Sequence, residues 1–95
     1  MMITTADIKA MSPNKLVSWF MIGCYAYYRL GTRVMEDCDF DYLVQRLKSG
    51  YNDADHHHKR FITEDHLNAG TGYDIEFPTI VKYATRDYMK EAGLW

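Results

Sequence analysis

Residues 16–28 form the longest nearly apolar run of the chain, and they constrain its fold more than any other stretch. The run lies within a segment, residues 13–30, that carries helix signals at both ends. Ser12-Pro13 supplies a favourable cap and first helical residue, and Gly31 is a natural C-terminal stop. The apolar side chains go nearly all round this helix instead of forming one stripe, which predicts burial on several sides. We therefore expect residues 13–30 to be the central helix of the domain.

A second helix is expected at about 37–48, with Asp37 as its cap and Ser49-Gly50 as its stop. Its apolar residues are spaced at i, i+3, i+4 and i+7, which is the pattern of a one-sided stripe: Phe40, Leu43, Val44 and Leu47. The connection from the central helix is short, so the two helices are predicted to form an antiparallel hairpin.

Further helix signals occur on both sides of this hairpin. A short helix capped by Thr4 or Thr5 is expected to reach about Met11, and another begins at Thr63 and stops within residues 69–72. A final helix should run from Pro78 to about Ala92, and its predicted buried face consists of Phe77, Val81, Ala84 and Tyr88. Residues 51–60 are predicted to be a polar loop pinned by Tyr51 and Phe61, and residues 73–77 extended chain. The predicted fold is mainly α: one domain (residues 1–95) of four to five helices around the central helix.

The composition argues against several functional classes. Thirteen acidic and eleven basic residues leave a net charge of −2, so strong nonspecific nucleic-acid binding is not expected. The apolar run is about half as long as a membrane span, and the first residues lack the basic and apolar regions of a signal peptide. The two cysteines, Cys24 and Cys38, form no Cys-x-x-Cys pair, which favours free thiols in a reducing compartment. We therefore expect a cytoplasmic protein with no membrane partner.

The hairpin also carries the most distinctive motif of the chain. The pattern Tyr-x-Tyr-Tyr-x-Leu at residues 25–30 is followed by Asp-x-Asp-Phe-Asp-x-Leu at residues 37–43. Over about residues 16–47, a third of the chain, this resembles the N-terminal helical segment of bacterial NAD-dependent DNA ligases. In that family the segment binds the nicotinamide mononucleotide half of NAD. The matching positions are Tyr27, Asp37, Asp41 and Leu43; the family's His falls on Tyr28 and its second Tyr on Phe40.

The resemblance implies a binding site for NAD or nicotinamide mononucleotide formed by Tyr27, Tyr28, Asp37, Phe40 and Asp41. Aromatic faces suit the flat, cationic nicotinamide ring. Carboxylates accept hydrogen bonds from ribose hydroxyls, and Asp37 and Asp41 are four residues apart on one helix face. However, Tyr28 lacks the charge of the family's His, and Phe40 lacks the hydroxyl of its Tyr. Because of these differences, the favoured role of the hairpin is that of a scaffold and contact surface, and a ligand pocket is the second interpretation.

No ligase activity is expected, because the family's adenylation signature, Lys-x-Asp-Gly, occurs nowhere in the chain. The stretch Leu67-Asn-Ala-Gly-Thr-Gly-Tyr is similar to small phage-type proteins that carry a ligase-like hairpin. That similarity implies a viral accessory protein, which would act in the host cytoplasm by binding a host factor.

Three other clusters are weaker candidates. His56-His57-His58, with Asp53, Asp55 and His66 nearby, contains metal-ligand types, but its spacing matches no structural zinc pattern, so a solvated loop is the favoured interpretation and no metal site is predicted. His58-Lys59-Arg60 is an alternative phosphate contact. Cys24 and Cys38 are predicted to be structural thiols. Residues 69–72 are predicted to be a helix stop, because they follow no strand and lack a phosphate-loop Lys.

The leading functional prediction is a small non-catalytic binding protein, an accessory or inhibitory factor that contacts a protein partner through the hairpin and the His-rich loop. The alternative is a nucleotide or NAD-fragment binding module. A metal-dependent enzyme built on the histidines is the third and weakest hypothesis.

Overall fold

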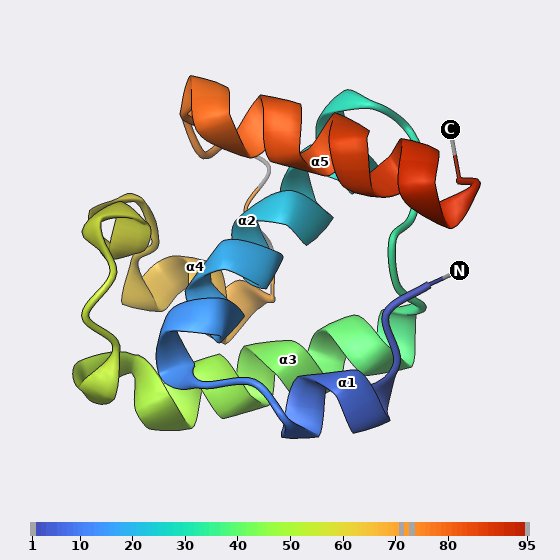
Figure 1. Ribbon diagram of the computed structural model, residues 1–95. Coiled ribbons are helices and arrows are strands. Elements are labelled where there is room, and N and C mark those ends of the chain that lie inside the picture. Colours follow the sequence, from blue (N-terminus) through green and yellow to red (C-terminus); the bar gives the residue numbers. More distant parts are fainter. Residues whose placement is uncertain (1, 71, 73, 95) are drawn as a thin grey trace.

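The computed structural model describes residues 2–70, 72 and 74–94 (Figure 1). It confirms a mainly helical fold with a central helix. Within the described residues the elements are, in chain order, α1 (Thr5–Lys9), α2 (Pro13–Arg29), α3 (Asp37–Gly50), the 3-10 helices η1 (Tyr51–Asp53) and η2 (His57–Phe61), α4 (Glu64–Ala69) and α5 (Thr79–Ala92). The β-structure of this part of the chain is one isolated parallel bridge between Ile3 and Met35.

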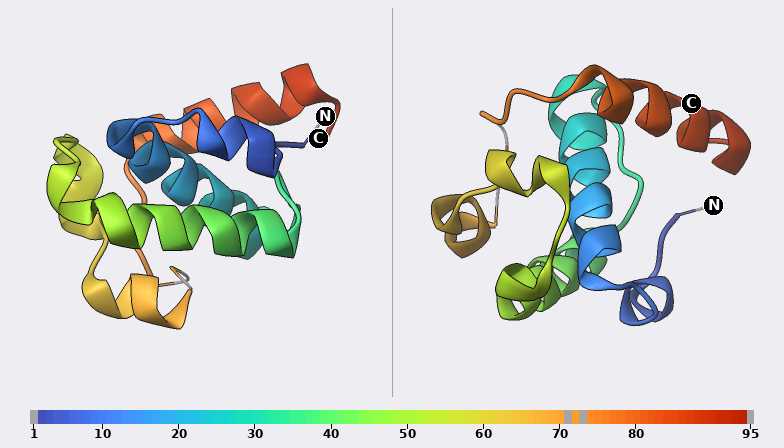
Figure 2. Two further views of the ribbon diagram at one scale, coloured as in Figure 1. Left: turned by 90° about the horizontal axis from the view of Figure 1, so that it is seen from below. Right: turned by 60° about the vertical axis from the view of Figure 1, so that its left-hand side comes forward.

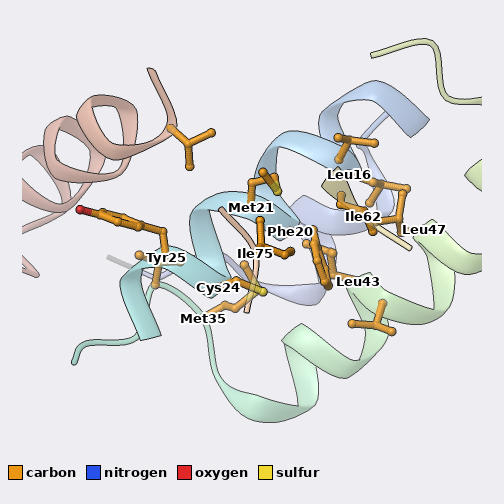
Figure 3. Packing of buried hydrophobic residues seen from close by; sticks show 14 of the residues in the cluster. Leu16, Phe20, Met21, Cys24, Tyr25, Met35, Leu43, Leu47, Ile62 and Ile75 are labelled. Carbon is orange, nitrogen blue, oxygen red and sulfur yellow. The ribbon is translucent and has the colours of Figure 1, made fainter. Parts of the chain in front are cut away.

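Helix α2 passes through the middle of the molecule, with α5 across one side and α3 and α1 along the other (Figures 1 and 2). Leu16, Phe20, Met21 and Cys24 of α2 are almost completely buried. They meet Leu43 and Leu47 of α3, together with Ile62 and Ile75 from later segments (Figure 3). The burial of α2 on several sides follows from its all-round apolar sequence, as expected.

Local signals set both ends of α2. The backbone N–H of Lys15 donates to the Ser12 hydroxyl at 3.4 Å, and Pro13 is the first helical residue. After the last helical residue, Gly31 adopts a left-handed conformation with φ of +69°. The predicted segment 13–30 is therefore confirmed to within one residue.

Helices α2 and α3 form the predicted antiparallel pair. A Cβ atom built on Gly50, at the end of α3, would lie 3.7 Å from Pro13 at the start of α2, whereas Gly23, late in α2, lies against Phe40 near the start of α3. The prediction that Asp37 caps α3 is wrong. Glu36 holds the cap position, without a side-chain hydrogen bond, and Asp37 is the first helical residue. Just before this cap, Ile3 N–H donates to Val34 O at 2.8 Å and Met35 is buried.

Two other sequence predictions are corrected. Residues 51–60, predicted to be a loop, contain η1 and most of η2. The Tyr51 hydroxyl donates to Ile62 O at 2.7 Å and the Lys59 amine lies 4.5 Å from the Tyr51 ring centre, so this polar segment is tied to the body by side chains and not by hydrophobic periodicity. The first helix ends at Lys9, two residues before the predicted Met11, after a capping box between Thr4 and Asp7.

Helix α5 begins after Pro78 and ends before Gly93, as predicted. Its buried face contains Val81, Thr85 and Met89, whereas Ala84 is exposed, contrary to the prediction. Thr85 takes the inner position because its hydroxyl donates to Val81 O at 2.7 Å, which satisfies the polar group inside the core. The 73–77 segment carries the buried Ile75 and Phe77 to α2; Tyr73 lies outside the described residues. Leu94 folds back with its N–H on Met89 O at 2.8 Å, and Trp95 is also outside the described part.

Candidate ligand pocket

A cavity of about 340 Å³ opens where the end of α2 faces the start of α3. All five residues that the sequence predicted for the ligand site line it. The complete lining is Gly23, Cys24, Tyr27, Tyr28, Arg33, Val34, Met35, Asp37, Phe40, Asp41 and Gly70. The hairpin therefore brings the sequence-predicted residues together around one space, with a small contribution from the end of α4.

Helical spacing explains why these side chains converge. On α2, Gly23 and Tyr27 are one turn apart, as are Cys24 and Tyr28, so each pair lies on the same side of the helix. On α3, residues 37, 40 and 41 are spaced at i, i+3 and i+4, which places them on one face of its first turns. The residues between the helices supply the remaining wall.

Gly23 and Phe40 form the base of the cavity. A Cβ atom at Gly23 would lie 3.3 Å from both Phe40 Cε1 and Met35 Cε, so the missing side chain is what lets these groups approach α2. The Phe40 ring is stacked on Phe20 with 5.7 Å between ring centroids and 22° between planes. This stacking fixes an apolar base and gives a packing reason for the glycine inside α2.

Two tyrosines form the aromatic rim. Tyr27 and Tyr28 are 49% and 39% exposed although they are large aromatic residues. Their rings meet edge to face, with centroids 5.0 Å apart and planes at 85°. The pair therefore offers two ring surfaces at right angles beside the cavity, an arrangement that suits contact with the face and the edge of a planar ligand.

Arg33 brings a positive charge to the same rim, and the sequence interpretation missed it. Its guanidinium lies 3.7 Å from a carboxylate oxygen of Glu36 and 3.7 Å from one of Asp37. Its central carbon is 5.9 Å from the centre of the Tyr27 ring. The available sequence signal was the spacing of an arginine three and four residues before two acids. That spacing predicts an ion pair in the turn, but not that the arginine faces the cavity.

Cys24 borders the cavity from the core side and is 1% exposed. Its sulfur lies among Met35, Ile75 and Phe20 in Figure 3. Burial raises the pKa of the thiol from 9.0 to about 12, against a smaller opposing effect of the hydrogen bond with the Gly72 backbone. Cys24 therefore stays protonated near neutral pH and is a packing residue, as predicted; Cys38 is also a free thiol and is exposed.

The ring nitrogens of His56 and His66 make structural hydrogen bonds. His56 Nδ1 accepts the N–H of His58 at 3.0 Å, and His56 Nε2 lies 3.1 Å from the Ser18 hydroxyl. His66 Nδ1 accepts the Thr63 N–H at 3.0 Å in the cap of α4, and its Nε2 is 2.8 Å from Asp74. The side chain of His57 lies outside the described part. Among the described residues, no three His, Cys, Asp or Glu side chains converge as metal ligands do.

The Gly-rich stretch ends α4, as predicted. Gly70 is the C-terminal cap, with φ of +67°, and it also borders the pocket. Gly72 is buried against the core, and Thr71 lies outside the described residues.

Comparisons with known protein families, curated proteins and solved structures give no match for this chain. Within the described residues, the helices lack the length and apolar character that crossing a bilayer requires.

Proposed function

We propose that this chain is a small non-catalytic binding module that takes nicotinamide mononucleotide, or the same half of NAD, in the α2–α3 pocket. The observation that carries the proposal is the convergence of Tyr27, Tyr28, Asp37, Phe40 and Asp41 on one cavity. Its volume of about 340 Å³ lies at the small end of the range for ligand sites. From the sequence alone, a protein-binding role of the hairpin was the leading prediction and nucleotide binding the alternative. The proposal made here puts nucleotide binding first.

The chemistry of the lining supports a pyridinium ring. The exposed Tyr27 and Tyr28 rings attract a flat cation through their faces, an interaction that extends to about 6 Å from the ring centre. Phe40 needs no hydroxyl in this arrangement, because its ring is already committed to stacking on Phe20. The difference from the ligase pattern at this position therefore leaves an apolar floor beneath the ligand.

The carboxylates support a ribose. Asp37 and Asp41 are exposed neighbours on the first turns of α3, and both border the cavity. Ionised carboxylates only accept hydrogen bonds, which suits the two hydroxyl donors of a ribose ring.

Calorimetric titration with nicotinamide mononucleotide tests this proposal, together with chemical-shift mapping of the same titration. We expect saturable binding with shifts at Tyr27, Asp37 and Asp41. The double variant Asp37→Asn/Asp41→Asn should weaken binding at least tenfold, since each lost charged hydrogen bond is worth roughly 1.5–3 kcal/mol. Asp65→Asn is the matched control, because Asp65 lies exposed in the first turn of α4, away from the pocket lining. No heat and no shifts in the wild-type protein would reject the pocket as a nucleotide site.

A protein partner is the second candidate, and it rests on α5. Ile80 and Tyr83 are 64% and 63% exposed on that helix, one turn apart. A partner captured in stoichiometric amount should be lost with Ile80→Ser/Tyr83→Ser and kept with Asp37→Asn/Asp41→Asn. Equal capture by the wild type and the α5 variant would remove this surface from consideration.

A further inference from the structure

The cavity has one positively charged lining residue in the described part of the chain, Arg33, which lies beside Asp37 on a rim that also includes Asp41. A guanidinium remains protonated at every physiological pH and presents several N–H donors in a plane. A carboxylate pair and a cation on one rim suit a ligand that itself carries both hydroxyl donors and an anion.

The present partners of Arg33 hold it only weakly. Both carboxylate distances are 3.7 Å, longer than the 2.7–3.2 Å typical of an N–H···O hydrogen bond. The side chains are 44% exposed for Arg33, 56% for Glu36 and 78% for Asp37. Ion pairs as open as these contribute about 0–1 kcal/mol. The guanidinium can therefore turn toward a ligand anion at little cost.

The backbone beneath Arg33 is better fixed than its tip. The next two residues, Val34 and Met35, are buried, and Val34 O accepts the N–H of Ile3 at 2.8 Å. The position of the arginine relative to Tyr27 and Asp37 is thus set by the turn, while its charged end reaches the solvent at the cavity mouth. A fixed base with an exposed cationic tip is well suited to capturing a phosphate.

We propose that Arg33 binds the phosphate of the ligand, so that the pocket selects a mononucleotide over the corresponding nucleoside. This inference rests on the proposed function. Arg33 would also supply the positive charge that is missing at Tyr28, where the ligase family has a His. Arginine forms short, charge-assisted and often bidentate hydrogen bonds with phosphate oxygens.

The test compares nicotinamide mononucleotide with nicotinamide riboside, which differ by the phosphate alone. The wild-type protein should bind the mononucleotide about ten- to a hundredfold more tightly, and the ratio should fall as salt is added. Arg33→Gln should reduce mononucleotide affinity by a similar factor, leave riboside affinity almost unchanged and so abolish the preference. Arg33→Lys should keep part of it, because the charge remains without the planar donor set.

Arg86→Gln is the matched control, since Arg86 is exposed on α5, outside the pocket lining, and the variant changes net charge equally. Circular dichroism and urea unfolding establish that each variant is folded. Equal wild-type affinity for the two ligands, or a preference retained in Arg33→Gln, would overturn the role of Arg33 while leaving the pocket as a nucleoside site. Absence of binding by both ligands would instead reject the proposed function itself.

Discussion

Gly72 occupies the tightest glycine position in the described core. A Cβ atom there would lie 2.7 Å from Ile75 Cδ1, 3.0 Å from Cys24 Sγ and 3.3 Å from Phe20 Cε2. These neighbours are themselves buried, so they have little room to move. The glycine therefore lets the segment after α4 lie directly on the central helix.

Replacing Gly72 with Ala should lower the free energy of unfolding by about 1–3 kcal/mol, the usual cost of overpacking a core. Gly31→Ala is the comparison, because its Cβ meets no atom within 4 Å and its φ of +69° makes the backbone conformation the only source of strain. That variant should lose about 1 kcal/mol. Urea unfolding of both proteins measures the difference, and a Gly72→Ala protein as stable as the wild type would contradict this account of the packing.

A substitution at Gly23 should change the shape of the pocket with little effect on the stability of the protein. Ala at this position gains up to about 1 kcal/mol in helix propensity, which offsets the 3.3 Å contacts with Phe40 and the flexible tip of Met35. We expect Gly23→Ala to unfold within about 1 kcal/mol of the wild type but to bind nicotinamide mononucleotide several-fold more weakly, because Phe40 is pushed into the cavity.

Gly50→Ala is the control for this substitution. It also replaces a helical glycine, but its Cβ has only ordinary contact with Pro13 at 3.7 Å and lies outside the pocket lining. Its affinity should equal that of the wild type. Full affinity in Gly23→Ala would mean that Phe40 is not the floor of the binding site.

At the level of elements, α1 is too short to be stable alone. Five residues lie well below the length at which an isolated helix persists in water. Its last carbonyls are held by α3: Arg46 Nη1 donates to Ile8 O at 2.7 Å and to Lys9 O at 3.0 Å. The buried Ile8 completes the contact.

Arg46→Met keeps much of the aliphatic stem and removes both hydrogen bonds. We expect a loss of about 1–2 kcal/mol in the free energy of unfolding and faster hydrogen exchange in α1. Gln45→Met, at the exposed neighbouring position, should change neither quantity appreciably. Unchanged exchange in α1 of the Arg46→Met protein would show that apolar packing alone holds this helix.

The elements also show which parts of the fold a sequence can predict. The ends of α2, α4 and α5 followed from caps and glycines such as Ser12, Gly70 and Gly93, because those signals act within one turn of chain. The start of α3 at residue 37 was also predicted, but its cap was not: Glu36 holds the cap position without a side-chain hydrogen bond, so no capping side chain marks it in the sequence. The exposed Ala84 and buried Thr85 differ from the prediction because a local hydroxyl bond makes the more polar residue the inner one.

The candidate site was predictable in part for the same reason. The convergence of the tyrosines and aspartates follows from helical spacing within one hairpin. The contribution of Gly70 depends on how α4 packs, and that of Arg33 on which way a turn residue points. Neither can be obtained from periodicity.

For the molecule as a whole, the buried thiol of the central helix predicts weakening in alkali. The unfolded chain releases the Cys24 proton near its ordinary pKa of 9.0, whereas the folded protein holds it until about pH 12. Between these values the unfolded state binds fewer protons, so the contribution of Cys24 to stability is constant below pH 9 and falls as pH rises from 9 to about 12. Tyr88 acts in the same direction above pH 10, because burial and the nearby Asp7 charge raise its pKa.

Urea unfolding at pH 7, 9 and 10.5 measures this dependence. Cys24→Ala should be less stable than the wild type at pH 7, owing to the cavity left in the core, but should lose less stability between pH 9 and 10.5. Cys38→Ala removes the exposed thiol and should reproduce the wild-type slope. An identical slope in Cys24→Ala would assign the alkaline loss to other groups.

The position of the motif at the edge of the core has a consequence for evolution. Its residues lie between positions 27 and 41, and Tyr27, Tyr28, Asp37 and Asp41 are exposed, whereas the packing of α2 depends on other positions. Substitutions at these four exposed positions can exchange one ligand for another without disturbing the interior. The hairpin is therefore a part of the protein where new specificities arise by few mutational steps, on a scaffold that the rest of the chain keeps constant.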